Sequence, residues 1–186
     1  ASFSTVNDIP INESLQWDDE QKLAFEKEII GFYLTGNPLT KFENDLKEFS
    51  NINLINLPKK IPTTIKIGGI PTNVTTRYDK KNKLWAIITL DGFVGRAEVF
   101  VFSDIYEKYK NIINEGKPIF IIGSASNRND NNDNLKFIAK EIYHMDGIRS
   151  RLSNYINIKL HKNVSSSELK AIKDIAIQNK KNIILY

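Results

Sequence analysis

The sequence contains no cysteine, a single methionine and no long hydrophobic run. Without cysteine, the chain can form neither a disulfide nor a thiolate-bound zinc site, which fits a reducing compartment. No apolar stretch approaches the roughly 18–20 residues of a membrane-spanning helix. No cationic start followed by an apolar run indicates a signal peptide. We therefore expect a cytoplasmic protein with no membrane partner.

The composition is that of a globular protein, with 41% hydrophobic and 26% charged residues among 186. That length allows one domain of ordinary size, or one small domain with appendages. The chain begins with Ala1, and its one methionine is Met145. We therefore expect it to be a piece of a longer protein.

Charge is distributed unevenly along the chain, although the net charge is only +4. Residues 1–58 hold four basic and ten acidic side chains, a net charge of −6. Residues 59–146 hold fourteen and ten, a net charge of +4, and residues 147–186 hold eight and two, a net charge of +6. An acidic head followed by a basic body indicates a body that binds a polyanion, but a set of solvated lysines gives the same totals.

The first third of the chain predicts two helices. Asp18 or Asp19 can cap a helix that runs to about Ile30, and Asn37-Pro38 then breaks the chain. Residues 39–49 predict a second short helix. Between the two helices, glycine and proline enclose a short aromatic elbow within FEKEIIGFYLTGNPLTKF. Residues 1–58 are therefore predicted to be a helical lead-in and elbow.

From Thr63 onward, the sequence predicts short strands separated by turns. The helix among them is expected to have Ser103 as N-cap and Gly116 just past its end. Gly68-Gly69 predicts a bulge or sharp coil that lets the first strand serve both halves of a closed sheet. The predicted elements are strands at 64–78, 84–90 and 96–102, a helix at 103–116, and strands at 117–128 and 135–145.

Three strands, a helix and two strands are the order of the OB-fold, a five-stranded Greek-key barrel with a capping helix. A β-sandwich would need about seven strands and fits less well. After this barrel, INIKLHKNVSSSELKAIKDIAIQNKKNIILY predicts strand, helix and strand, with Ser165 to Ser167 and Glu168 at the helix start. The chain is therefore predicted to be mainly β, with a helical segment at 1–58, the OB-fold barrel at 59–146 and a partial C-terminal α/β domain at 147–186.

Strand alternation assigns a candidate nucleic-acid face to the barrel. The side chains predicted to fill the barrel are Ala86, Ile88, Leu90, Ala97, Val99 and Val101. Trp85 and Phe100 then point outward. Phe102, beside the capping helix, is expected to pack beneath it instead.

Cations crowd the first turn, next to Trp85, and a second polar loop follows near residue 128. Basic side chains neutralise phosphates, and an aromatic ring stacks an unpaired base for about 1–3 kcal/mol. The predicted nucleic-acid-binding residues are Arg77, Tyr78, Lys80, Lys81, Lys83, Trp85, Arg96, Phe100, Arg128, Asn129 and Lys136.

No pattern of residues indicates an active site or a metal site. His144 and His161 lie in different segments without paired carboxylates nearby. The loop that starts at Asp130 resembles part of a calcium-binding loop, but Leu135 stands where that loop requires glycine. We therefore expect no catalytic residue, no metal and no cofactor in this chain.

The elbow carries the most specific resemblance in the sequence. FEKEIIGFYLTGNPL resembles a segment of the bacterial replicative DNA polymerase III alpha subunit that lies shortly before an OB domain, with Asn37 where the family usually has histidine. TLDGFVGRAEVFVF is similar to a stretch of that OB domain, with Gly92 where an acid is common. The tail that ends in NIILY is similar to the start of the family's C-terminal domain, so the resemblance covers residues 17–186.

This resemblance implies a non-catalytic module of a DNA-directed DNA polymerase, a nucleotidyltransferase, that binds single-stranded template DNA. The family's catalytic palm, which uses Mg²⁺, would lie far upstream. The implied partners are single-stranded DNA, the remainder of the alpha chain, the clamp-loader tau subunit through the C-terminal domain, and the sliding clamp.

Two other interpretations remain open from the residues. The OB domain can serve mainly in protein–protein docking within the polymerase holoenzyme, with Trp85 and Phe100 buried at a partner surface. It can also be an OB module of another enzyme, such as a tRNA-binding domain, but the elbow argues against that. Salt dependence separates binding of single-stranded DNA from protein–protein docking, because phosphate neutralisation is sensitive to salt and apolar docking is not.

Overall fold

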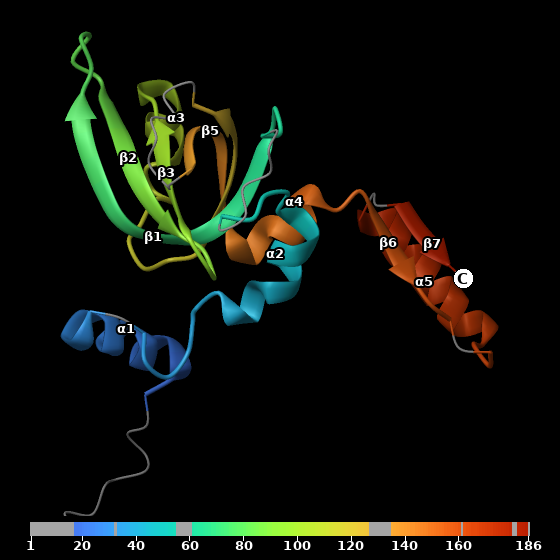
Figure 1. Cartoon of the computed structure of the whole chain (residues 1–186). Coiled ribbons are helices and arrows are strands. Elements are labelled where there is room, and N and C mark those ends of the chain that lie inside the picture. The colour runs from blue at the N-terminus through green and yellow to red at the C-terminus, as the bar shows by residue number, and fades with distance from the viewer. Residues whose placement is uncertain are drawn as a thin grey trace, which may run out of the picture.

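Five strands close into a barrel in the computed structural model, which describes residues 17–31, 33–54, 61–126, 135–160, 162–179 and 182–185. The order around the barrel is β1-β2-β3-β5-β4, with β4 paired back to β1 (Figure 1). All pairs are antiparallel except β3 with β5. This is the predicted OB-fold, which is confirmed. The strands are β1 (Ile65–Tyr78), β2 (Leu84–Asp91), β3 (Arg96–Val101), β4 (Ile119–Ala125) and β5 (Leu135–His144).

The long strand β1 belongs to both halves of the barrel. Its first part, to Gly69, pairs with β4, and the part from Ile70 onward pairs with β2. The strand passes through Gly68 and Gly69 without a break, and its register shift lies later, between Pro71 and Asn73. The two glycines hold no bulge, but β1 changes its partner from β4 to β2 directly after them, so the prediction that this strand serves both halves of the barrel is confirmed. The glycines serve close packing, because a Cβ on Gly68 would lie 2.2 Å from the Leu46 side chain.

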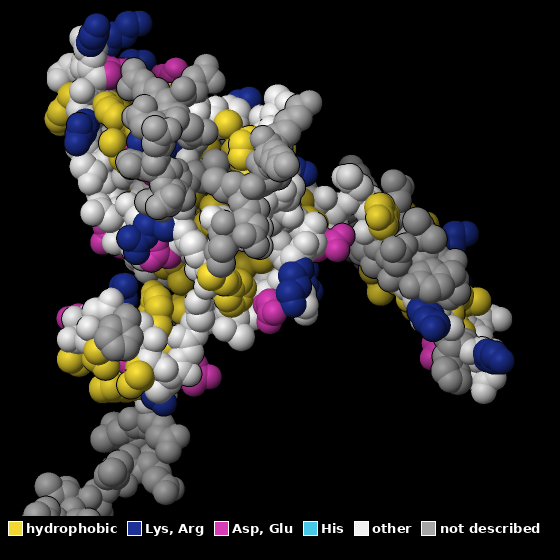
Figure 2. Space-filling view, viewed as in Figure 1, with side chains coloured by type: hydrophobic (Ala, Val, Ile, Leu, Met, Phe, Trp, Pro, Cys, Tyr) yellow, Lys and Arg dark blue, Asp and Glu magenta, His cyan; other side chains and the backbone are white. Residues whose placement is uncertain are grey.

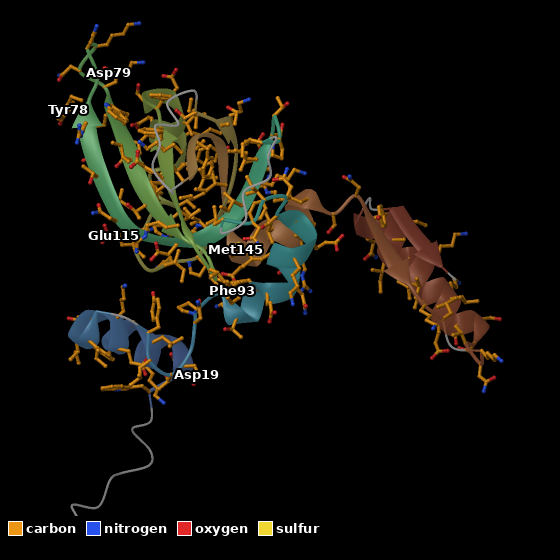
Figure 3. All side chains as sticks on the ribbon, viewed as in Figure 1. Asp19, Tyr78, Asp79, Phe93, Glu115 and Met145 are labelled. Atoms are coloured by element: carbon orange, nitrogen blue, oxygen red, sulfur yellow. The ribbon has the colours of Figure 1, made fainter. Side chains whose placement is uncertain are left out.

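The loop before β4 fastens the bent part of β1. Glu115 accepts the Val74 N–H with its carboxylate (Oε1···N 2.8 Å), and the Gly116 N–H donates to the Pro71 carbonyl (2.9 Å) (Figure 3). These bonds satisfy β1 backbone groups at the register shift, where β1 leaves β4. The loop before β4 thus supplies hydrogen bonds to β1 where β1 has passed the end of its pairing with β4.

The barrel core follows the predicted alternation. Every second side chain of β2 and β3 is fully buried, while the residues between them are only partly buried or exposed. The confirmed inward set is Ala86, Ile88, Leu90, Ala97, Val99 and Val101. The intervening side chains form an outer face that is available for a ligand.

The capping helix α3 (Ser103–Tyr109) is shorter than the sequence predicts. It ends seven residues before Gly116, because Ile113 turns into the barrel core instead of continuing the helix. Phe102, not Ser103, is the N-cap residue, and no side chain caps this end. The Ser103 hydroxyl donates instead to Asp79 (Oγ···Oδ2 3.0 Å).

The N-terminal helix α1 (Asp19–Ile30) begins and ends as predicted. Asp18 caps it by accepting the Gln21 N–H (2.7 Å), and Gly31 ends it at φ 87°, a conformation that glycine adopts without strain. The following elbow is tied back to the helix, because the Glu26 carboxylate accepts the N–H groups of Leu34 and Thr35 at 2.8 and 2.9 Å.

Asn37 opens the second helical segment, η2 (Thr40–Phe42) and α2 (Glu43–Phe49). Its side-chain oxygen accepts the Leu39 N–H (2.9 Å), and its carbonyl accepts the Thr40 N–H (2.8 Å). Asn37 therefore forms an ordinary hydrogen-bonded turn directly before this segment, whose N-cap residue is Leu39.

A second apolar cluster joins α2 to the barrel. The side chains at its centre are fully buried or nearly so, and they come from four separate parts of the sequence. Next to it, Arg149 of α4 (Ile148–Leu152) binds Asp45 of α2 through an ion pair. The sequence did not predict α4 or η3 (Met145–Gly147). The cluster consists of Leu39, Phe42, Leu46, Ile70, Phe120, Met145 and Ile148.

The C-terminal unit is strand, helix, strand, as predicted. β6 (Tyr155–Ile158) and β7 (Asn182–Leu185) pair in parallel, and α5 (Ser166–Asn179) connects them. Ser165 and Glu168 form a capping box at the helix start, with Ser165 N–H to Glu168 Oε2 at 2.8 Å and Glu168 N–H to Ser165 Oγ at 3.3 Å. Among the described residues, no helix has the length and apolarity needed to cross a membrane.

Candidate nucleic-acid interface

Three aromatic rings form a row on the outer face of β2 and β3. The ring of Trp85 lies 6.5 Å from that of Phe100 and 6.1 Å from that of Phe102, measured between centroids. Trp85 and Phe100 are partly buried, whereas Phe102 is 50% exposed. The prediction that Phe102 packs beneath the capping helix is therefore wrong. It extends the surface that the sequence assigned to Trp85 and Phe100.

Strand register fixes what surrounds this aromatic row. Arg77 of β1 is the cross-strand partner of Trp85, so its exposed side chain lies on the same outer face. Phe100 lies between Ile87 and Ile138 of the neighbouring strands. The row therefore has an arginine at its β1 side and partly buried apolar side chains at its centre.

The β1–β2 turn carries the three exposed lysines Lys80, Lys81 and Lys83, beyond the end of the aromatic row. Figure 2 shows basic side chains at the tip of this hairpin. Asn82 adopts φ 58°, a left-handed conformation that asparagine tolerates better than most residues. The Asp79 N–H donates to the Lys83 carbonyl (2.9 Å), and the Asn82 N–H to the Asp79 carbonyl (3.0 Å).

Acidic side chains accompany these lysines. Asp104 of α3 lies 3.4 Å from Lys83 Nζ, and both side chains are exposed, so the pair contributes little to stability. Hydrogen bonds hold the pKa of Asp79 below its ordinary value, first the bond from the Lys83 N–H and then those from Ser103 and Lys81. The turn lysines, Asp79, Ser103 and Asp104 together line a shallow pocket.

Two predicted residues lie apart from the aromatic row. Tyr78 is 66% exposed, but it pairs with Leu84, so its side chain is on the opposite face of the hairpin from Trp85. Arg96 lies at the other end of β3 and binds Asp91 in a fork, with Nε···Oδ1 2.7 Å and a second bond of 3.3 Å. That hydrogen-bonded partner raises the pKa of Arg96.

The remaining predicted residues lie near β5. Lys136 is partly buried on that strand and is the register partner of Glu98. Arg128 and Asn129 lie outside the described residues. Of the predicted residues that the structure describes, Trp85, Phe100, Arg77 and the turn lysines lie on one side of the barrel, with Lys136 across the sheet and Tyr78 and Arg96 apart from them.

The described part of the chain holds no cluster of candidate metal ligands. Within those residues, no three His, Asp or Glu side chains gather closely enough to hold a metal ion.

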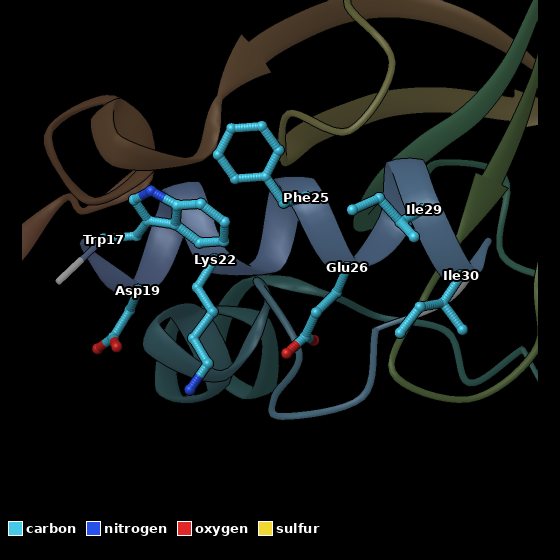
Figure 4. A pocket seen from close by; sticks show the side chains of 7 residues that line it. All are labelled: Trp17, Asp19, Lys22, Phe25, Glu26, Ile29 and Ile30. Carbon is cyan, nitrogen blue, oxygen red and sulfur yellow. The ribbon is translucent and has the colours of Figure 1, made fainter. Parts of the chain in front are cut away.

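A second surface feature, which the sequence did not predict as a site, follows helix α1. Trp17 and Phe25 pack together with 4.5 Å between ring centroids, and Ile29 is 78% exposed (Figure 4). The apolar spacing along this helix was visible in the sequence, but its exposure was not. The pocket there is lined by Trp17, Asp19, Lys22, Phe25, Glu26, Ile29 and Ile30.

Comparison with known proteins finds relatives named DNA polymerase III subunit alpha, although no protein-family model matches the chain. DNA polymerase III subunit alpha of Borreliella burgdorferi is 27% identical over 162 residues, which cover 83% of this chain and 14% of that protein. The protein of the same name from Buchnera aphidicola is 30% identical over 149 residues, which cover 77% of this chain and 12% of that protein. The chain thus spans only a small part of the length of these relatives.

Solved structures with a similar fold include single-stranded DNA-binding proteins. One from Thermus aquaticus is 16% identical with a TM-score of 0.36, and the match covers 45% of this chain and 40% of that one. The mitochondrial protein Rim1 from S. cerevisiae is 16% identical with a TM-score of 0.34, covering 44% of this chain and 90% of that one.

Proposed function

The chain is homologous to a part of the bacterial DNA polymerase III alpha subunit, and we propose that it is a non-catalytic module that binds single-stranded template DNA. The observation that carries this proposal is the meeting of an aromatic row with a lysine turn on one face of an OB barrel. Strands 2 and 3 and the adjoining loops are where OB-folds bind oligonucleotides.

The two parts of this face suit two parts of a nucleotide. Lys80, Lys81, Lys83 and Arg77 supply exposed positive charge for phosphates, and Trp85 with its neighbouring rings supplies flat apolar surface for bases. A stacking surface needs unpaired base faces, which a duplex does not offer. Single strands are therefore the preferred ligand.

The polymerase reaction itself belongs, in this proposal, to other parts of a longer chain. The parent protein would be a DNA-directed DNA polymerase whose Mg²⁺-dependent catalytic residues lie upstream. The module would hold the template near that active site in the cytoplasm, and it would need no cofactor of its own.

The same proposal includes protein partners. The remainder of the alpha chain would contact the module directly. The C-terminal unit, with Ile175 and Ile177 of α5 more than half exposed, would take part in docking to the clamp-loader tau subunit. The N-terminal segment would lie toward the sliding clamp. These partners rest on the family resemblance together with exposed apolar surface.

A titration with labelled oligonucleotides tests the DNA-binding proposal. Fluorescence anisotropy is measured with the whole chain, a single strand and the matching duplex, each at two salt concentrations. We expect weak binding that favours the single strand and falls steeply with salt. Duplex preference, or no binding at low salt, would contradict the proposal and favour docking as the main function.

A further inference from the structure

One carboxylate holds the lysine turn in shape. Asp79 Oδ1 accepts the backbone N–H groups of Lys81 (2.8 Å) and Lys83 (2.9 Å). Its other oxygen, Oδ2, accepts the hydroxyl of Ser103 at the start of α3 (3.0 Å). Asp79 therefore fixes the backbone of two of the three turn lysines and joins the turn to the capping helix (Figure 3).

The position of this acid is unexpected for a site that binds phosphate. A negative charge within the lysine turn opposes an anionic ligand by Coulomb repulsion. The hydrogen bonds that Asp79 accepts lower its pKa, so the carboxylate stays charged at neutral pH. Its cost to binding must therefore be offset by what it does for the turn.

Asp104 provides the natural comparison. It also places a carboxylate beside the turn, 3.4 Å from Lys83 Nζ, and its side chain is 89% exposed. It accepts no backbone N–H of the turn among the bonds described above. The two acids thus add the same charge near the lysines, and only Asp79 shapes the backbone.

We propose that Asp79 is a positioning residue for DNA binding, which orders the β1–β2 turn so that its lysines meet the phosphates with little loss of conformational freedom. This inference rests on the proposed single-stranded DNA function. Ordering a loop before binding removes a cost that the complex would otherwise carry. The Ser103 bond adds to the effect, because it sets the turn at a fixed place relative to α3 and the neighbouring Phe102.

The test compares Asp79→Ala with Asp104→Ala in single-strand titrations of the whole chain. If charge alone matters, both variants bind more tightly than the original protein. If Asp79 positions the turn, Asp79→Ala instead weakens binding by about twofold to tenfold. This is the cost of immobilising one or two side chains of the turn when the DNA binds. Asp104→Ala should bind at least as tightly as the original protein. The slope of log affinity against log salt should stay close to the original value in Asp79→Ala, because every lysine remains.

Asp79→Asn separates the charge from the hydrogen bonds. The amide oxygen still accepts the N–H groups of Lys81 and Lys83, and the amide nitrogen can donate to Ser103. We expect this variant to bind at least as tightly as the original protein. Ser103→Ala, which removes the link to α3 without a change of charge, should weaken binding less than Asp79→Ala.

An independent readout comes from the free protein. Hydrogen exchange followed by NMR should show faster exchange of the Lys81 and Lys83 amides in Asp79→Ala, and near-original exchange in Asp79→Asn. Melting temperatures show whether each variant is folded. If Asp79→Ala does not fold, Ser103→Ala takes its place in the comparison.

The outcomes distinguish this inference from the proposed function. If the original protein binds single strands but Asp79→Ala binds as tightly as Asp104→Ala, the positioning role is wrong and the proposed function stands. The positioning role is also wrong, and the function again stands, if Asp79→Asn weakens binding as much as Asp79→Ala. If the original protein binds no single strand at low salt, both the function and the inference fail.

Discussion

Replacing Trp85 by alanine should weaken DNA binding at least as much as it weakens the fold. Trp85 is partly buried against Phe100 and Phe102, but it belongs to neither of the two buried clusters that hold the protein together. Loss of the ring contacts should lower the free energy of unfolding by about 1 kcal/mol. Loss of one base-stacking platform should lower the free energy of binding by about 1–3 kcal/mol, a factor of about 5 to 150 in Kd.

Anisotropy titrations with a labelled single strand measure this effect, with thermal melts to measure stability. The salt slope should hardly change, because stacking releases no counterions. Trp17→Ala is the matched control, since it removes the only other tryptophan, which precedes α1 and packs against Phe25 of that helix. An unchanged affinity in Trp85→Ala, together with a large fall in melting temperature, would show that the ring serves packing and would refute the assignment of this face.

Two further predictions concern the scaffold. Gly68→Ala should lower the free energy of unfolding by about 1–3 kcal/mol in denaturant titrations, because the new Cβ would lie 2.2 Å from the Leu46 side chain. Gly147→Ala, whose Cβ would meet nothing within 4 Å, is the control, and equal losses in the two variants would contradict this packing. Hydrogen bonds from the elbow, first that of Thr35, lower the pKa of Glu26. The bonds between the Glu26 carboxylate and the elbow are therefore intact above the ordinary pKa of a glutamate, and they are lost as the pH falls through the lowered pKa of Glu26. Hydrogen exchange followed by NMR should therefore show that the Thr35 amide loses protection, relative to an unprotected amide, as the pH falls. Protection of this amide that does not change with pH would contradict the link.

Local patterns were enough to predict most of the barrel. Alternation in β2 and β3 assigned the inward side chains correctly, because one face of each strand is buried and its period is two. The helix α1 and the capping box at Ser165 were equally visible, since capping depends on residues three or four positions apart.

Features that depend on distant segments were not visible in the sequence. The length of α3 was overestimated because Ile113 fits a helical pattern as well as it fits the barrel core. No local signal showed that Leu46, from a separate helix, packs against Gly68 and leaves no room for a side chain there. The cluster around Leu39 and Met145 joins segments about a hundred residues apart, so no local period reveals it.

The candidate site likewise combines features that local sequence patterns predict and features that depend on distant segments. Strand alternation placed Trp85 and Phe100 on the outer face correctly. It places Phe102 on that face too, but the expectation that α3 covers Phe102 was wrong. The role of Asp79 had a local signal, since an aspartate at the start of a short turn commonly accepts backbone N–H groups. Its bond to Ser103, 24 residues later, had none.

The central claim is that the lysine turn binds the phosphates of a single strand, and one measurement tests it most directly. The affinity for a labelled single strand is followed against salt for the original protein and for the variant with Lys80, Lys81 and Lys83 changed to alanine. A second triple variant, with the exposed lysines Lys162, Lys170 and Lys173 of the C-terminal unit changed to alanine, has the same net charge. We predict weaker binding and a slope of log affinity against log salt that is flatter by about 0.7 for each lost phosphate contact in the turn variant only. Unaltered affinity and slope in the turn variant, or equal changes in both variants, would contradict the claim.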